Sequence, residues 1–470
     1  MAVEPERVRV EEIDWSNLFP FVRLFHAFRL AIHPTKFLLA LLMVLSLWVG
    51  GQILDTIAGK RVLPGEIVVY ATKSQNQFDD YVASEKQLVP DENCLGVISA
   101  AFEFKINRFN TMVIKATELK FGFGDLLKEG SIGSDSVVGA LYDIVVNLPR
   151  WFFNMHPWCL LVWCVFSLAV CAFFGGAIAR LAASHASRNE HLTMGQSIRF
   201  AVGYWPWFFA SPLIPLLFAL LLGLFMASFG LLFNVEGLDW IGGVLFGLAL
   251  LFGAIIALLL IGLAAGAPLL FPAIAVEGTD AFDAVSRIYN YVFGRPWRWL
   301  FYSLISLVYG AITYLFVGLV IFLALHATRY CVGAWVFRDA AVENLNRFAV
   351  IMPLPQLGEL TYDIQWSKLN WAGKITLLLV SIWVRLAMGL LAAYAISYYF
   401  SSQTWIYLLL RRAADGTEYD DLFVEEAVTE ASSAAAVAAP DKVESFSPEL
   451  ESPSATGSFG SNPDKDSPSS

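Results

Sequence analysis

Long apolar stretches separated by short charged ones dominate the chain. Six stretches have about the 20 residues that a helix needs to cross a bilayer. They cover residues 37–58, 157–179, 208–232, 241–265, 299–326 and a part of 375–410. The pattern predicts an all-α fold, a polytopic membrane bundle of six transmembrane helices.

The third and fourth stretches sit in uncharged runs that are longer than one straight crossing requires. Pro206, Pro212 and Pro215 lie in or before the third, and Pro268 and Pro272 follow the fourth. Because proline removes a helical hydrogen bond, we expect bent or re-entrant ends there.

Arginines mark the connections on one side of the predicted bundle. The loop 180–199 carries Arg180, Arg188 and Arg199, the loop 277–298 carries Arg287, Arg295 and Arg298, and the connection 234–240 carries only acids. The positive-inside rule then places both termini and the two arginine-bearing loops in the cytoplasm. We expect a multi-pass protein of a bacterial cytoplasmic (inner) membrane.

This topology divides the chain into segments. They are a cytoplasmic segment with an interfacial helix (1–36), span 1 (37–58), an extracytoplasmic insertion (59–150), spans 2–5 (151–326) with cytoplasmic elbows at 180–207 and 277–298, an extracytoplasmic loop (327–373), span 6 (374–412) and a tail (413–470). The segment before span 1 has no signal-peptide pattern, so we expect that span to be retained.

The insertion 59–150 is long enough to fold. "EIVVY" (66–70) favours a strand, and the stretch 95–123 is mixed but helical. Residues 136–153 place Val137, Leu141, Ile144, Val145 and Leu148 at helical spacing, which is typical of a helix lying on the membrane surface. Two interpretations stay open, a surface for a protein partner and a lid on the bundle.

Charge is sparse and uneven. Hydrophobic residues make up 57% of the chain and charged residues 15%, against about 25% charged residues in soluble domains. Residues 413–470 hold 13 acids and 2 lysines, which leaves 29 basic and 28 acidic residues elsewhere. The composition predicts a disordered, acidic cytoplasmic tail, which is a second candidate contact for a protein partner, and it gives no indication of nucleic-acid binding.

Three approaches to the membrane resemble one another. They are "FRLAIHPTKF" (28–37), "SIRFAVGYWPWFF" (197–209) and "SRIYNYVFGRPWRW" (286–299), and each has an arginine, then a proline, then a span. "AIAR" (177–180) and "AIAV" (273–276) end the preceding spans. Three tandem units of an interfacial helix and a helical hairpin would give this pattern, although arginine, proline and tryptophan also gather at unrelated membrane entries.

The succession "FPAIAVEG" and "AFDAVSRIYNYVFGRPWRW" resembles the membrane domains of glycerophosphodiester phosphodiesterase-type proteins and the YciC-like bacterial membrane family. The ends "FRLAIHPTKFLLALL" and "SSQTWIYLLLRRAADG" resemble polytopic proteins of planctomycete-type bacteria. The resemblance covers about 25 residues well and the remainder by hydropathy alone, so it implies a helical membrane domain. It carries over no catalytic activity, because the chain shows no soluble phosphodiesterase domain.

The stretch 280–299 shows how such an elbow is built. Asp280 is a candidate N-cap, and Asp283 and Arg287 are spaced to pair. The apolar face consists of Ala281, Phe282, Val285, Ile288, Tyr289 and Val292. Arg199, Arg287, Arg295 and Arg298 are candidate contacts for anionic lipid headgroups, and Trp205, Trp207, Trp297 and Trp299 are candidate membrane anchors.

Arg385 is a charged residue within the last apolar stretch. It would be buried if the last span covers 375–400, and it would mark the outer interface if that span covers 386–410. We favour the interfacial position, because Arg411 would then end a span of ordinary length.

Few residues suggest chemistry. "HASRNEH" (185–191) lacks the order and spacing of a metal motif, and the five cysteines form no CxxC pair. Cys94 and Cys331 fall on the same predicted side, and a disulfide between them stays open. The sequence indicates no catalytic residue, no metal and no cofactor.

Spans two to five contain no Asp, Glu, Lys or Arg between their ends, which disfavours an ion-coupled carrier. We therefore expect a non-enzymatic membrane scaffold or accessory component in contact with lipid. The alternative is a transporter or channel for an unknown solute, and an intramembrane enzyme is the least favoured class.

Overall fold

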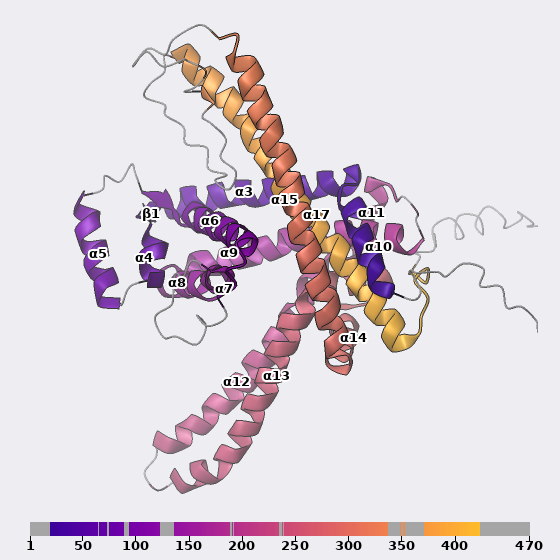
Figure 1. Cartoon of the computed structure of the whole chain (residues 1–470). Coiled ribbons are helices and arrows are strands. Elements are labelled where there is room, and N and C mark those ends of the chain that lie inside the picture. Colours follow the sequence, from indigo (N-terminus) through magenta and orange to yellow (C-terminus); the bar gives the residue numbers. More distant parts are fainter. Residues whose placement is uncertain are drawn as a thin grey trace, which may run out of the picture. The chain divides into compact units, whose positions relative to one another are not determined.

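A computed structural model describes residues 19–63, 65–72, 75–88, 94–122, 136–188, 190, 192–234, 237, 239–336, 348, 351–352 and 371–423 (Figure 1). Helices account for almost all of these residues. The predicted tail from residue 424 onward and most of the predicted loop 327–373 lie outside the described residues.

The helices follow the order of the predicted spans. The first part holds η1 (Pro20–Phe25), α2 (His26–Ala31), α3 (Pro34–Ala58), α4 (Glu66–Thr72), α5 (Gln75–Leu88), α6 (Val97–Thr117), α7 (Val137–Tyr142), η4 (Asp143–Asn147) and α8 (Leu148–Met155). The second part holds α9 (Pro157–Val170), η5 (Cys171–Gly175), α10 (Gly176–Ser187), α11 (Met194–Ala210), α12 (Leu213–Gly230), η6 (Leu231–Asn234), α13 (Asp239–Glu277), α14 (Ala281–Gly294), α15 (Pro296–Gly333) and α17 (Trp371–Asp415).

Six helical stretches are long and apolar enough to cross a membrane. They are Pro34–Ala58, Pro157–Ser187, Met194–Gly230, Trp240–Glu277, Pro296–Gly333 and Gly373–Asp415. The all-α, six-span prediction is confirmed, although most of the helices run past the predicted ends of the spans.

The prolines behave differently in the two long stretches. At Ser211–Pro212 the helix is interrupted between α11 and α12, as the sequence predicts. Pro268 and Pro272 instead lie inside the continuous helix α13, so the expectation of a re-entrant end is wrong there. The surrounding residues 269–276 are buried among other helices, and this packing holds the segment helical despite its missing N–H groups.

The insertion begins with a two-stranded antiparallel ladder of β1 (Lys60–Val62) and β2 (Leu95–Gly96). The predicted strand 66–70 is wrong, because these residues form α4. Glu66 starts that helix, accepts hydrogen bonds from the backbone N–H of Leu63 and from Trp151 Nε1, and is buried. Ile67 and Ala71, four residues apart, turn to the core, so tertiary contacts override the β-propensity of this stretch.

The predicted helical stretches of the insertion are confirmed as α6 and as α7, η4 and α8. Asp143 in the π-helical turn η4 is fully buried and pairs with Arg108 of α6 at 3.1 Å. The predicted surface stripe divides in two, because Leu148 packs with Trp151 in the core of the insertion, whereas Leu141 and Val145 stay exposed.

The insertion is tied to the first span by a carboxylate. Asp55, near the end of α3, accepts the backbone N–H of Ile98 at 2.7 Å and of Ser99 at 2.8 Å, which caps α6 from another helix. A Cβ at Gly96 would lie 2.2 Å from Asp55 Cγ, so the close approach requires a glycine. Part of the insertion thus folds directly on α3.

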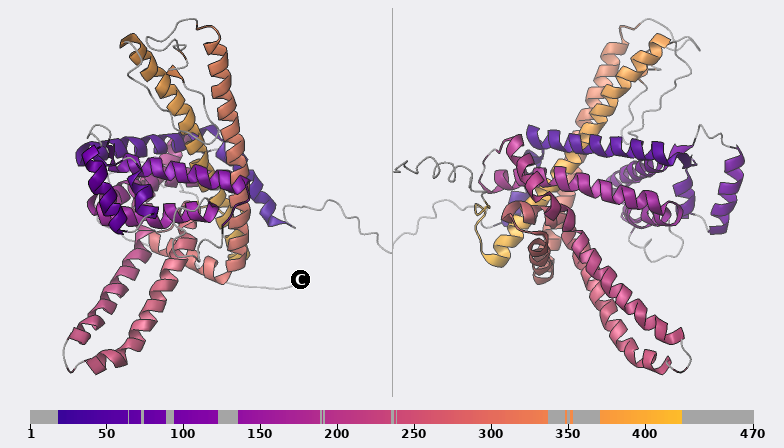
Figure 2. Two further views of the ribbon diagram at one scale, coloured as in Figure 1. Left: turned by 60° about the vertical axis from the view of Figure 1, so that its left-hand side comes forward. Right: turned by 180° about the vertical axis from the view of Figure 1, so that it is seen from behind.

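The spans pair as hairpins. α3 packs with α9, α12 with α13, and α15 with α17. Figures 1 and 2 show the last two pairs side by side in every view. Much of their apolar surface has no protein neighbour, as at Leu220, Leu250 and Leu307, which are more than half exposed. Such all-round apolar helices are suited to a lipid environment.

A second set of contacts joins the hairpins in a cycle. α10, α13 and α17, which end the second, fourth and sixth spans, contact one another pairwise. Each also packs on the helix that precedes the next hairpin: α10 on α11, α13 on α14, and α17 on α2 at the start of the chain. Three tandem units that close on themselves would give this pattern of contacts.

The elbow 277–298 has the predicted N-cap and the predicted glycine before it. Asp280 Oδ1 accepts the backbone N–H of Asp283 at 2.8 Å, and Gly278 has φ +63°. The predicted apolar face of α14 is rotated, because Phe282 is 62% exposed, whereas Ala284 and Tyr291 are buried with Ile288. Alanine fits where α14 lies close to α13, so contact distance and not hydrophobicity selects the buried face.

We predict that Asp55→Ala loosens the insertion without unfolding the spans. The change leaves two buried N–H groups of α6 without their acceptor, and hydrogen bonds to a charged group contribute about 1.5–3 kcal/mol. Limited proteolysis in detergent should cut the insertion at least ten-fold faster than in the wild type.

The matched control is Asp79→Ala, which removes an exposed carboxylate of α5 in the same insertion. Equal cleavage rates for the two variants would contradict the capping role of Asp55.

Candidate functional site

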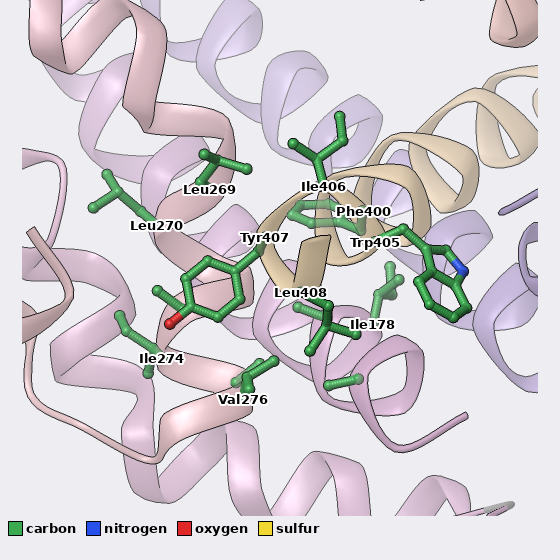
Figure 3. Packing of buried hydrophobic residues seen from close by; sticks show 14 of the residues in the cluster. Ile178, Leu269, Leu270, Ile274, Val276, Phe400, Trp405, Ile406, Tyr407 and Leu408 are labelled. Atoms are coloured by element: carbon green, nitrogen blue, oxygen red, sulfur yellow. The ribbon is translucent and has the colours of Figure 1, made fainter. Parts of the chain in front are cut away.

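The ends of α10, α13 and α17 meet in the largest buried cluster of the described residues. Figure 3 shows Tyr407 and Leu408 of α17 between Ile178 of α10 and Ile274 of α13. All four side chains are at most 1% exposed. We call this region the junction. Each of its helices brings an ionisable residue, so we call the end of the bundle at which the junction lies the charged end.

Arg180 joins two of these helices through backbone oxygens. It is buried on α10 and donates from Nη1 to the carbonyl of Ala275 at 2.7 Å and from Nη2 to the carbonyl of Phe423 at 2.7 Å. Its guanidinium also lies 4.4 Å from the ring centroid of Phe200 on α11. One arginine of the "AIAR" motif therefore binds the backbone of the matching "AIAV" motif.

Glu277 is the acidic centre of the junction. Its carboxylate accepts from Tyr407 Oη at 3.0 Å and lies 2.7 Å from Arg411 Nε. Arg287 of α14 approaches the same carboxylate at 3.9 Å and pairs with Asp283 at 2.8 Å. Because Glu277 ends α13 and Arg411 lies near the end of α17, this pair fixes the register of one helix against the other.

The segment 416–423 after α17, which we call the strap, returns over the junction. Its last residue, Phe423, donates its backbone N–H to Val276 at 2.9 Å. Arg188 donates to the carbonyl of Asp420 at 3.0 Å, and Arg411 pairs with Asp421 at 3.0 Å. Leu422 is buried in the core cluster.

An aromatic residue of the strap is held by two further arginines. The ring of Tyr419 lies between Arg23, 3.9 Å from its centroid, and Arg412, at 4.5 Å. The strap thus contacts η1 as well as α10, α13 and α17.

The predicted disordered tail therefore needs a later start. Helix α17 continues to Asp415, and residues 416–423 are bound in place. Asp415 accepts from Tyr291, Asp421 pairs with Arg411, and the distant Arg180 and Arg188 bind backbone carbonyls of the strap; composition alone does not show such partners.

Burial and pairing shift the pKa of two groups on α14. Burial raises the pKa of Tyr291, and its hydrogen bond to Asp415 raises it further, so the phenol stays protonated as a donor. Burial lowers the pKa of Arg287, but Asp283 and Glu277 more than offset this effect, and the net pKa lies above the ordinary value. Both groups keep their hydrogen-bonding form across physiological pH.

The junction is built to hold helices together. Its buried charges bind backbone carbonyls, carboxylates or a phenol within the chain, and in the described residues they form no nucleophile and base pair. Paired charges of this kind add specificity, because each mispaired arrangement would leave a charge unpaired in an apolar cluster.

The predicted headgroup arginines divide into two groups. Arg287 is engaged by Asp283 and Glu277. Arg199 and Arg298 are exposed and Arg295 is half-buried, and none of the three makes an ion pair within the part of the chain that the structure describes. These three remain free to contact lipid.

The predicted anchors and Arg385 lie on the surface of the helices. Trp205, Trp207 and Trp297 are exposed, Trp299 is half-buried, and Trp205 Nε1 donates to the carbonyl of Ala169 at 3.1 Å. Arg385 is exposed on α17, so its side chain is not enclosed in the bundle, and its interfacial depth stays a prediction. Cys94 is buried and Cys331 exposed, and both are free thiols.

Sequence reasoning used Arg180 and Arg411 only as signs of topology. The signal for the junction was present, because Arg180, Glu277 and Arg411 are each the first ionisable residue after the apolar run of an even-numbered span. Aligning the ends of the three units would have placed them together.

Comparison of the chain with protein-family models, curated proteins and solved structures finds no match.

We predict that Glu277→Gln destabilises the bundle by about 1.5–3 kcal/mol, because the buried Arg411 loses the closer of its two carboxylate partners and keeps Asp421. Thermal unfolding in detergent, followed by tryptophan fluorescence, should show a lower midpoint. Arg298→Gln serves as the control, since that side chain is exposed and unpaired among the described residues. Equal midpoints for both variants and the wild type would rule out the proposed role of the Glu277–Arg411 pair.

Proposed function

We propose that this multi-pass membrane protein is a non-enzymatic scaffold or accessory component of a bacterial cytoplasmic membrane, in contact with lipid and with a protein partner. One observation carries the proposal. The buried charges of the junction are paired within the chain, while residues 200–235, 240–276 and 299–328 contain no Asp, Glu, Lys or Arg.

The distribution of charge favours a structural role over transport. Translocated ions and polar solutes need partners in the hydrocarbon region, and carriers place ionisable side chains there. In this chain the ionisable groups bind helix to helix at the charged end instead. A transporter remains the alternative function, without a described polar path in its favour.

The arginines at the charged end indicate how the protein is oriented in the membrane. Arg188, Arg199, Arg295, Arg298 and Arg412 all lie in or beside the segments that connect the spans there. An excess of arginine in short connections is typical of the cytoplasmic side. We therefore place the junction and the strap in the cytoplasm and the insertion outside.

The flux test uses purified protein in liposomes loaded with a potassium-sensitive, a pH-sensitive or a small anionic dye. We expect leakage equal to that of protein-free liposomes, because the apolar spans offer no charged partner to a crossing ion. Gramicidin added at the end shows that flux would be detected. Protein-dependent flux of any of the three solutes would replace the scaffold by the transporter.

The partner test uses photocrosslinking in cells from the exposed apolar stripe of the insertion. A benzophenone amino acid at Val145, which is 61% exposed, should give a discrete protein adduct, because exposed apolar patches are typical of contact surfaces. The same probe at Asp79, an exposed polar position, is the control. Only intramolecular or lipid adducts at Val145 would favour the lid interpretation.

A further inference from the structure

One buried lysine has no partner in the part of the chain that the structure describes. Lys36 lies in the first turn of α3 and is 1% exposed. Its Nζ makes no hydrogen bond to any residue that the structure describes. An ammonium group without a counter-charge in an apolar setting costs several kcal/mol, so an ionised Lys36 requires a partner that the described residues do not provide.

The start of α3 adds further unpaired donors. His33 is the N-cap residue, and its side chain forms no capping bond. Pro34 has no N–H, and the first intrahelical donor is Phe37, which binds the carbonyl of His33 at 3.0 Å. This leaves the N–H groups of Thr35 and Lys36 without a helical acceptor at the positive end of the helix dipole.

Side chains of a helix lean toward its N-terminus, so we expect Lys36 to direct its ammonium group along the same turn. Two histidines and an arginine lie close to this turn. The rings of His33 and His185 of α10 meet at 5.4 Å between centroids, both residues are half-buried, and Arg29 lies one turn earlier. The half-buried histidines give this turn an open edge.

No acid approaches from the elements around this turn. Residues 19–54, residues 176–187 of α10 and residues 371–414 of α17 contain neither Asp nor Glu. α17 packs along this part of α3, with Ser397 Oγ donating to the carbonyl of Ala31 at 2.7 Å. Asp415, the first acid of α17, binds Tyr291 instead.

We infer that the N-terminal turn of α3 is a binding site for a phosphate-bearing anion, held by Lys36 and the free N–H groups of Thr35 and Lys36. Helix N-termini bind phosphate through free N–H groups and the dipole, and a lysine supplies the matching charge. The turn lies at the end of the bundle where arginines gather, the level of phospholipid headgroups. An anionic phospholipid is one source of this phosphate group, and free phosphate is the other.

The inference deepens the lipid contact of the proposed function and rests on it only for the membrane position of α3. It differs from the surface arginines, since Arg199, Arg295 and Arg298 would attract anionic lipid without ordering a single molecule. The site therefore predicts saturable binding of one anion.

The test compares full-length protein in nanodiscs of phosphatidylcholine alone and with phosphatidylglycerol, by thermal unfolding and native mass spectrometry. The wild type should unfold at a higher temperature with phosphatidylglycerol and retain one tightly bound lipid. Lys36→Met should lose this rise, and its apparent Kd for phosphatidylglycerol should be about ten-fold higher or more, the loss expected for one charged hydrogen bond. Lys374→Met, which removes an exposed lysine of α17, should behave like the wild type.

Further measurements distinguish lipid from free phosphate as the source of the anion, and a loss of binding from a failure of the variant to fold. Inorganic phosphate added to phosphatidylcholine nanodiscs should reproduce the rise if free phosphate is the natural source, and should have no effect if the lipid is. Lys36→Gln provides the same readout if the methionine variant does not fold. The triple variant Arg199→Gln, Arg295→Gln, Arg298→Gln should lose weakly held lipid but keep the single tight one.

An equal rise in the wild type and both Lys36 variants would overturn the inference and leave the proposed function intact. A Lys36→Met protein stabilised equally in both nanodiscs, relative to the wild type, would also overturn it, because the lysine would then be only an unpaired group. Solute flux in liposomes would refute the scaffold role without bearing on this site.

Discussion

The structure depends on how three helices bring charge into an apolar cluster and pair it there. Arg180, Glu277 and Arg411 stand at the ends of long apolar runs, where the helices leave the hydrocarbon region. Each is largely buried by the other two units, so each must find a partner from another part of the chain. Burial of this kind contributes little net stability, but it penalises every arrangement that separates the partners.

The cyclic order of the units follows from the same constraint. Arg180 binds the backbone of α13, Glu277 of α13 binds Arg411 of α17, and α17 packs on α2 at the beginning of the chain. The strap completes the set by offering carbonyl groups and the Asp421 carboxylate to arginines on α10 and α17. The rest of the hairpins, which carry few polar groups, can then meet lipid along most of their surface.

The hydrophobic pattern of the sequence predicted the features that are set by the surrounding bilayer or by local turn geometry. The number of spans, the arginine-bearing elbows and the cap at Asp280 are visible in the sequence, since a bilayer of fixed thickness demands long apolar helices and turns demand particular residues. The stretch 66–70 shows the limit. Its β-branched residues favour a strand in isolation, yet Glu66 and Ile67 are held in a helix by Trp151 and the core of the insertion. The rotated face of α14 has a similar origin in close packing at Ala284.

The sequence by itself determined the membrane class, the six spans and the side on which positive charge collects, because these follow from composition and periodicity along the chain. Only the tertiary structure decided which charges are paired. Arg180 and Phe423 are far apart in sequence, and Asp421 belongs to a stretch whose composition indicates disorder. It also decided that Lys36 is enclosed without a hydrogen-bond partner among the described residues. Partners separated by hundreds of residues leave no periodic signal, so their meeting depends on how the helices pack.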